Sequence, residues 1–207
     1  MKLEILAKDA DFTLAAWDYD ERLYKKIHFI AKPIFEKYDV QPQEMKSEWP
    51  HISSALVEDP TPEERNKIKL AAGIIKPKFQ FKQLDIFPGQ KQFGVDYFSV
   101  EFNVPNEFQK FIDFLTDICG SDRVKQYKVH RPHVSIWAIK QDQTTQAKKA
   151  IPEIYRAVKK YLQPFTPTKI SLWDNFEISE IESIGSIIRK PTWRKQIRNK
   201  YLIISMT

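Results

Sequence analysis

The sequence is poor in cysteine and in glycine. Cys119 is its single cysteine, and it has five glycines. A single cysteine excludes an intrachain disulfide and a zinc cluster of several thiolates, so we expect a reducing compartment. No apolar run approaches the roughly 18 residues that a membrane-spanning helix needs, and the first residues lack the pattern of a signal peptide. These absences predict a soluble intracellular protein, placed in the cytoplasm with the nucleus left open.

Hydrophobic and basic residues are abundant. Hydrophobic residues make up 42% and aromatic residues 13% of the 207 positions. This is enough for one substantial domain or for two small lobes that share a core. The formal net charge is +6, and the sequence pI is about 9.2. A positive excess of this size favours anionic partners through long-range attraction.

Hydrophobic periodicity predicts an alternation of strands and helices. Thr61, Pro62 and Glu64 have the pattern of a helix N-terminus with a capping box, and Gly120 has that of a C-cap. Pro152 falls inside a helical pattern, where it predicts a split. The expected strands are 2–6, 51–58, 78–87, 93–104, 133–139, 168–174, 175–183 and 200–206, and the expected helices are 20–40, 59–75, 106–120 and 144–162.

The order of these elements contains a weak internal repeat. A strand that opens with Pro, His, an apolar residue and Ser leads into a helix and further strands, and the arrangement then occurs a second time. Such a repeat indicates two related lobes of α+β type that face each other across a cleft. We therefore expect a single bilobal domain over 1–207, in which the region 164–207 is the least closely defined.

The two copies of the motif are "PHIS" at 50–53 and "PHVS" at 132–135, with their histidines 82 positions apart (133 minus 51). Alternate residues of a strand share a face, so each histidine should project with the serine two positions after it. Together these groups suit an attack on phosphorus. A neutral histidine takes the proton of the attacking hydroxyl, a protonated one donates to the leaving oxygen, and the hydroxyls bind the phosphate oxygens. This chemistry needs no metal or other cofactor.

A single His-x-Ser is common and more often belongs to a structural histidine, but two copies that each open an apolar strand favour a functional interpretation. The pair resembles the signature of the 2H phosphoesterase superfamily, here as "HISS" and "HVSI". The resemblance implies two antiparallel sheets that face a central cleft, with helices outside. It also implies that His51 and His133 are the catalytic pair and that Ser53 and Ser135 bind the phosphate. The first motif departs from the pattern, because "SALV" follows where a long apolar residue is usual after the hydroxyl.

The resemblance implies a metal-independent phosphodiesterase, with ligase activity also found in the group. Its substrate would be a 2′,3′-cyclic phosphate, a 2′-5′ oligoadenylate or an RNA 3′ end, and the assignment of acid and base stays open. Residues near the motifs are candidate substrate contacts, aromatic rings by stacking on a base and cations by attracting phosphate. They are Tyr127 (the preferred stacking residue), Trp49, Trp137, Lys128 and Arg131. The basic run 189–200 either grips an RNA backbone or forms an exposed loop.

A function from another class stays open beside the enzyme. The same fold could serve as a non-catalytic module that binds RNA or a nucleotide. The presence of both histidines and both hydroxyls favours the enzyme, because a pure binder has no chemical need for them. A purely structural role would leave both motifs buried. We expect a monomer whose partner is an RNA, an oligonucleotide or a cyclic nucleotide, and no membrane partner.

Overall fold

The computed structural model describes residues 12–45, 50–89, 94–125, 131–167, 169–173 and 202–205. In chain order, their elements are β1 (Phe12–Asp18), α1 (Glu21–Lys37), β2 (Gln43–Glu44), β3 (His51–Glu58), α2 (Pro62–Ile74), β4 (Phe81–Phe87), β5 (Val95–Phe102), α3 (Asn106–Cys119), β6 (Val124–Lys125), β7 (His133–Lys140), the 3₁₀ turn η2 (Gln141–Gln143), α4 (Thr144–Val158), the 3₁₀ turn η3 (Lys159–Tyr161), β8 (Lys169–Trp173) and β9 (Leu202–Ser205).

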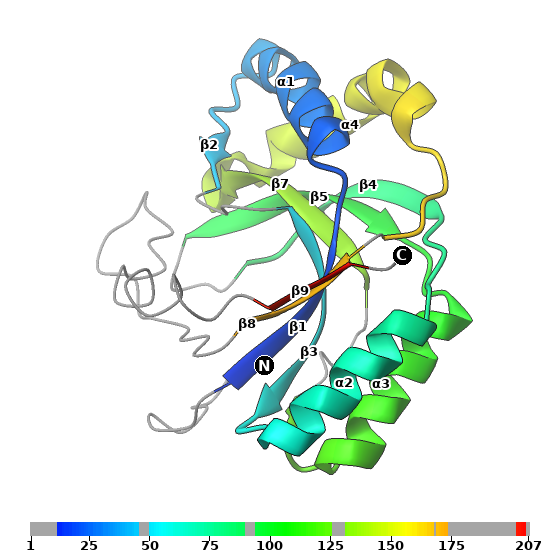
Figure 1. The fold of residues 1–207 in the computed structure, drawn as a ribbon. Helices are drawn as coiled ribbons and strands as arrows, with labels where there is room; N and C mark the ends of the chain where they lie inside the picture. The colour runs from blue at the N-terminus through cyan, green and yellow to red at the C-terminus, as the bar shows by residue number, and fades with distance from the viewer. Residues whose placement is uncertain are drawn as a thin grey trace.

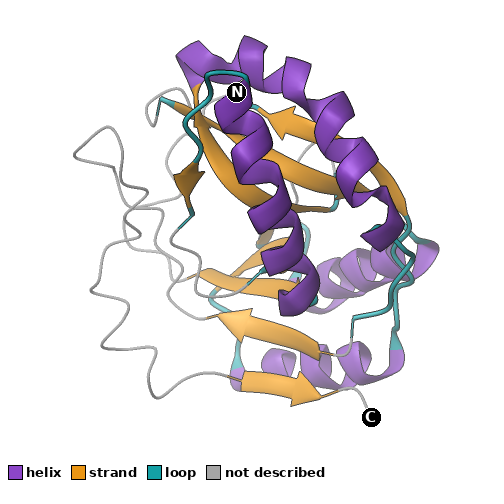
Figure 2. Cartoon of the chain, turned by 90° about the horizontal axis from the view of Figure 1, so that it is seen from above, coloured by secondary structure: helices purple, strands orange, loops and turns teal. Residues whose placement is uncertain are grey.

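The strands form two antiparallel sheets. Sheet A has the order β6-β3-β1-β8-β9, and sheet B has the order β2-β7-β5-β4. Helices α1 and α4 lie over sheet B, α2 and α3 lie at the side of sheet A, and both sheets lie between the two helix pairs (Figure 1, Figure 2). The expected α+β class, with two antiparallel sheets and helices outside, is confirmed.

The two halves of the described chain repeat the same order of elements. Each half runs strand, helix, two-residue strand, motif strand, helix, strand: first from β1 to β4, and again from β5 to β8. The two-residue strands are exchanged, because β2 pairs with β7 and β6 pairs with β3. The weak repeat in the sequence is therefore a repeat in the structure, and each half completes the sheet of the other.

Phe79 and Phe165 join the halves at equivalent positions, each between the last helix and the last strand of its half. Their backbones form a mutual pair of hydrogen bonds of 2.9 and 3.0 Å. Their rings stack with centroids 5.5 Å apart. This contact of a residue with its own counterpart marks an internal pseudo-two-fold axis.

Local sequence signals explain several helix ends. Thr61 and Glu64 form the expected capping box at the start of α2, and Gly120 ends α3 with a φ of 89°, a conformation that glycine adopts without strain. The split predicted at Pro152 is wrong, since α4 continues through this proline. Pro152 is exposed, so its ring displaces no core side chain. The buried face of α4 holds the helix on sheet B through Ala147, Ala150, Ile154 and Val158.

The sequence placed the first strand at 2–6, which lies outside the described residues, as does the expected strand 175–183. It missed β1, which lies at the centre of sheet A between β3 and β8. Residues Leu14 to Trp17 of β1 are at most 1% exposed. A strand buried on both faces shows no alternation of polar and apolar residues, which is why periodicity did not detect it.

Candidate active site

The two motif strands have equivalent neighbours in their sheets. His51 at the start of β3 lies opposite Asp18 of β1, and His133 at the start of β7 lies opposite Glu101 of β5. The carbonyl of the proline before each histidine accepts a hydrogen bond from the residue after the acidic one. These bonds are 3.1 Å in the first half and 2.9 Å in the second. The two histidines therefore have equivalent strand pairing and an equivalent hydrogen bond at the preceding proline.

A bulge follows each histidine by three positions. Ser54 on β3 and Ile136 on β7 have no partner in the register of the adjacent strand. An extra residue in one strand resets the alternation of side chains beyond it. Before the bulge, each histidine shares a face of its strand with the motif serine. After the bulge, the residue four positions beyond the histidine, such as Trp137 on β7, lies on the opposite face.

All four motif side chains are partly accessible. His51, Ser53, His133 and Ser135 are of intermediate exposure, whereas the apolar residue within each motif, Ile52 or Val134, is buried. Strands β3 and β7 belong to different sheets but contact one another. The two histidines therefore begin strands that neighbour one another, although these strands belong to different sheets.

The surroundings of His133 favour one state of its ring. Its Nδ1 lies 2.7 Å from the carbonyl oxygen of Arg131. A carbonyl oxygen only accepts, so Nδ1 carries a hydrogen, and in the neutral ring Nε2 bears the lone pair. Burial lowers the pKa of His133 below the usual value for histidine, which favours the neutral form at pH 7. The ring stacks on Phe87, with centroids 4.4 Å apart and planes at 16°.

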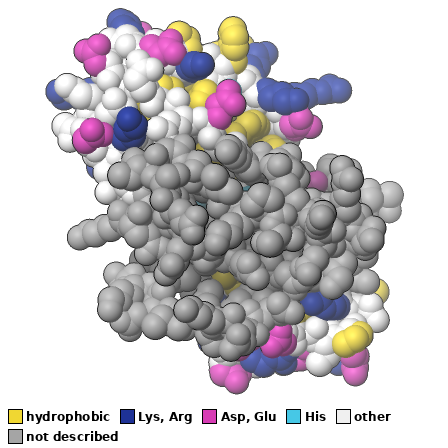
Figure 3. Space-filling view, turned by 90° about the vertical axis from the view of Figure 1, so that its left-hand side faces the viewer, with side chains coloured by type: hydrophobic (Ala, Val, Ile, Leu, Met, Phe, Trp, Pro, Cys, Tyr) yellow, Lys and Arg dark blue, Asp and Glu magenta, His cyan; other side chains and the backbone are white. Residues whose placement is uncertain are grey.

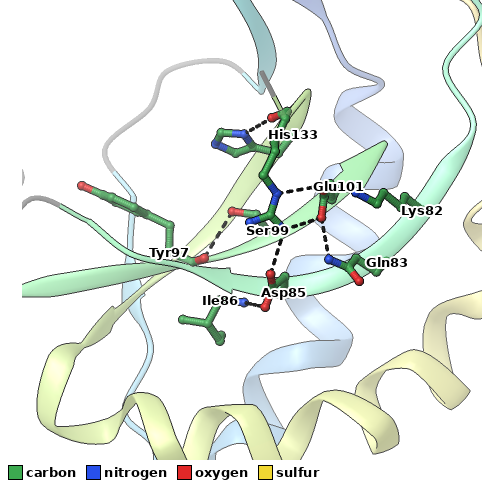
Figure 4. A network of polar contacts seen from close by, with 9 residues as sticks. Lys82, Gln83, Asp85, Ile86, Tyr97, Ser99, Glu101 and His133 are labelled. Carbon is green, nitrogen blue, oxygen red and sulfur yellow. Dashed lines mark hydrogen bonds and ion pairs between the residues drawn. The ribbon is translucent and has the colours of Figure 1, made fainter. Parts of the chain in front are cut away.

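Ser135 has a hydroxyl partner on the next strand. Ser99 of β5 lies opposite it in register, and the two Oγ atoms are 3.3 Å apart. The Ser99 Oγ is also 3.3 Å from the carbonyl oxygen of Tyr97 (Figure 4). When Ser99 donates to Ser135, the hydrogen of Ser135 is free for a ligand.

A buried carboxylate lies beside His133 (Figure 4). The side chain of Glu101 is 1% exposed and accepts hydrogen bonds from Arg131, Lys82 and Gln83. The hydrogen bonds from Arg131, followed by those from Lys82 and Gln83, lower the pKa of Glu101 to about 2. Arg131 also donates to Asp85 at 2.9 Å. The charge of Arg131 is therefore balanced by two carboxylates.

The expected aromatic and basic contacts divide into three groups. Trp137 is fully buried, stacks on His28 of α1 at 3.6 Å and donates from Nε1 to the carbonyl of His28. A base cannot stack on it, so the expectation for Trp137 is wrong. The bulge at Ile136 is the physical reason, since it turns Trp137 away from the face of His133.

Arg131 does lie beside His133, but its guanidinium is engaged by carboxylates. Trp49, Tyr127, Lys128 and the run 189–200 lie outside the described residues.

Sequence reasoning missed Glu101, Ser99 and Phe87. Glu101 and Ser99 lie within an apolar strand pattern, and a charged or hydroxyl residue at a strand position that should be buried was the available signal. No sequence pattern assigns Phe87 to the histidine, because their contact depends on the pairing of β4, β5 and β7.

The described residues show neither a metal site nor a membrane-spanning helix. They contain no group of three or more His, Cys, Asp or Glu side chains arranged to hold a metal ion. None of their helices has the length and apolarity needed to cross a membrane. On the face drawn in Figure 3, their acidic and basic side chains are interspersed.

Known proteins resemble this chain in structure. No family model and no curated protein matches the sequence. Usb1 of Kluyveromyces marxianus matches with a TM-score of 0.55 and 7% identity, over 96% of this chain and 99% of that chain. Usb1 with uridine monophosphate matches with a TM-score of 0.49 and 7% identity, over 94% of this chain and 97% of that chain. E. coli LigT complexed with NADP+ matches with a TM-score of 0.44 and 12% identity, over 96% of this chain and 100% of that chain. At such identities only the fold is comparable, and only the first score is high enough to show it. The fold of this chain is similar to that of Usb1, and the paired motif is the feature of its sequence that resembles the 2H phosphoesterase superfamily.

Proposed function

We propose that the protein is a metal-independent phosphodiesterase that acts on RNA or oligonucleotides, with His51 and His133 as its acid and base. One observation supports this most strongly: the two histidines have equivalent surroundings on contacting strands. Each lies opposite an acidic residue, each precedes a bulge by three positions, and each shares its face with a serine. Stability alone gives no reason to repeat a polar, accessible arrangement in both halves of a chain.

The environment of His133 suggests that it is the base. Its Nε2 takes the proton of the attacking hydroxyl while the oxygen of that hydroxyl forms a new bond to phosphorus. The bond from phosphorus to the leaving oxygen breaks, and protonated His51 donates its proton to that oxygen. The products are the transferred phosphodiester and a free hydroxyl. His133 ends protonated and His51 neutral, so a second step with water runs in the opposite sense and restores both.

Ser53 and Ser135 are assigned to the non-bridging phosphate oxygens. A hydroxyl that donates to an oxygen with growing negative charge stabilises the transition state more than the ground state. Ser99 assists by donating to the Ser135 Oγ, which leaves the Ser135 hydrogen for the phosphate.

The substrate class comes from the resemblance and from the positive net charge. A ribose hydroxyl that attacks its own phosphate gives a 2′,3′-cyclic end, and water that attacks a cyclic phosphate opens it; the same four groups serve both. The three candidates are a 2′,3′-cyclic phosphate, a 2′-5′ oligoadenylate and an RNA 3′ end. Tyr127, Trp49 and Lys128 remain proposed contacts for the base and the phosphate chain. Arg131 is not among them, because Glu101 and Asp85 engage its guanidinium.

The test is to incubate the protein, with EDTA present, with a panel of 2′,3′-cyclic, 2′-5′-linked and 3′-5′-linked substrates and to identify the products by mass. We expect one linkage to be cleaved, and expect His51→Ala and His133→Ala each to slow its turnover by about 10²–10⁴-fold. His28→Asn is the matched control, since His28 lies on α1 against Trp137, and it should retain the wild-type rate. Full activity of both His51→Ala and His133→Ala would exclude the proposal.

A further inference from the structure

The start of β7 is held by a series of contacts that begins at Glu101 and ends at the ring of His133 (Figure 4). The two carboxylate oxygens of Glu101 accept hydrogen bonds from Arg131, 2.8 Å from Nε and 2.5 Å from Nη2. A two-pronged contact between a carboxylate and a guanidinium fixes orientation as well as position. Because Glu101 is buried on a central strand of sheet B, it is a rigid anchor for Arg131.

Arg131 reaches the imidazole by two routes. Its carbonyl oxygen is the hydrogen-bond partner of Nδ1, at 2.7 Å. Its guanidinium carbon lies 4.1 Å from the centroid of Phe87, and Phe87 stacks on the imidazole of His133. The main chain and the side chain of one residue therefore both constrain the ring. A residue that only supplied a surface charge would do neither.

The charges around Glu101 are balanced. Lys82 donates to Glu101 at 2.9 Å, and Arg131 donates to Asp85 at 2.9 Å. Two carboxylates thus face two cations. Removing a carboxylate from water is costly, and a buried ion pair adds little stability over a well-packed apolar pair. Stability is therefore a weak reason for a buried glutamate here, whereas the placement of the neighbouring histidine is a specific one.

We propose that Glu101 is a positioning residue for His133. Through Arg131 it fixes the orientation and the Nδ1–H tautomer of the imidazole, so that Nε2 is presented to the attacking hydroxyl. The inference rests on the proposed function, in which His133 is the base, and adds to it a residue that does not touch the substrate.

The first readout separates kcat from KM. Glu101→Gln keeps the shape of the side chain but loses its charge, so Arg131 is held less firmly. We expect kcat to fall about 10- to 100-fold, as for a catalytic group displaced by about 1 Å. KM should change less than about twofold, because Glu101 makes no contact with the substrate. Arg131→Lys keeps the charge but not the fork, and should lower kcat in the same way.

The second readout is the pH profile of kcat/KM, whose acid limb reports the base of the free enzyme. The charge of Glu101 raises the pKa of His133, and the charge of Arg131 lowers it. Glu101→Gln should therefore move the acid limb to lower pH, and Arg131→Gln should move it to higher pH. The other titratable groups of β2, β3, β4, β5 and β7, among them Asp85 and Lys82 on β4 and His51 on β3, are the same in both variants. Shifts in opposite directions distinguish charges that act on His133 from a general loss of folding, which would not reverse its sign between the two variants.

Lys82 offers a matched control. It pairs with the same carboxylate, is half exposed, and makes no contact with Arg131 or His133 among the described interactions. Lys82→Met should keep kcat within about twofold and leave the acid limb where it is.

The third readout does not depend on activity. Nitrogen-15 NMR of the histidine rings in the full chain distinguishes the tautomers, and His133→Gln assigns the signal among the four histidines. At neutral pH we expect a protonated Nδ1 in the wild type and a mixture of tautomers in Glu101→Gln. If Glu101→Gln does not fold, as judged by circular dichroism, Arg131→Lys serves for the same measurement.

An unchanged tautomer, an unchanged kcat and an unmoved acid limb in Glu101→Gln would overturn the positioning role. The proposed function would survive that result if His51→Ala and His133→Ala were still inactive. If those two variants were active, the proposed function would fall instead, and the NMR measurement would still decide whether Glu101 positions the ring.

Discussion

Ser99 and Ser135 face each other across β5 and β7, with their hydroxyl oxygens 3.3 Å apart. Ser99 is fully buried, and Ser135 is partly exposed on the same face as His133. The equivalent position of the other half holds Ala16, opposite Ser53. The two halves therefore differ at this position. A buried hydroxyl lies opposite Ser135, whereas an alanine lies opposite Ser53.

Substitution of the three serines tests this difference. Ser135→Ala and Ser53→Ala should each lower kcat/KM by about 10- to 150-fold, the equivalent of about 1.5–3 kcal/mol for a hydrogen bond to a charged group. Ser99→Ala should cost only about 2- to 12-fold, since it removes a neutral hydrogen bond that orients Ser135. Steady-state kinetics on the substrate that the panel identifies will rank the three. A loss in Ser99→Ala as large as that in Ser135→Ala would assign Ser99 itself to the phosphate.

The free energy of unfolding should depend on pH in the histidine range. Burial lowers the folded-state pKa of both His133 and His28. Above about pH 6.5, the usual pKa of histidine, both rings are neutral whether the chain is folded or unfolded, and their contribution is fully present. As the pH falls below that value, the unfolded chain binds protons that the folded chain does not, so stability declines until the folded-state pKa values are passed.

Urea unfolding at pH 8, 6.5 and 5 measures this decline. The carboxylates with lowered pKa, Glu101, Glu64 and Glu153, release their contribution only below about pH 4.5 and do not interfere. His28→Asn and His133→Asn should each reduce the slope between pH 6.5 and 5. A wild-type protein equally stable at pH 5 and 8 would show that neither ring is buried as described.

Arg123 should support stability without affecting turnover. Its guanidinium binds Glu64 and the carbonyls of Glu58 and Asp59, which ties the end of β3 to the start of α2. This joint is at the opposite end of β3 from His51. Arg123→Met should lower the free energy of unfolding by about 1–3 kcal/mol, with kcat at the wild-type value below the melting temperature. Thermal denaturation and kinetics together measure both, and a fall in kcat at full folding would contradict this division.

The sequence was informative where local rules apply. Near neighbours predict the two motif strands, seen as β3 and β7, the capping box at Thr61 and the strand at 200–206, seen as β9. The order of elements also disclosed the repeat, because each half is built from adjacent pieces of chain.

It was not informative where the outcome depends on distant contacts. Trp137 is a candidate substrate contact from its place four residues after His133, but the bulge at Ile136 turns it away from the face of that histidine. Arg131 was read as a phosphate ligand because its partners, Glu101 and Asp85, are brought to it only by the pairing of three strands. Ion pairs between residues so far apart in the chain leave no local pattern.

If His51 and His133 act together on one phosphate, their substitutions should not be additive, and a double-mutant cycle on kcat measures this. Acid and base groups that work as a unit are non-additive, since losing either leaves little for the other to lose. We predict that His51→Ala combined with His133→Ala is about as slow as the slower single variant. A double variant whose loss equals the product of the two single losses would mean that the two rings act independently, and would contradict the account.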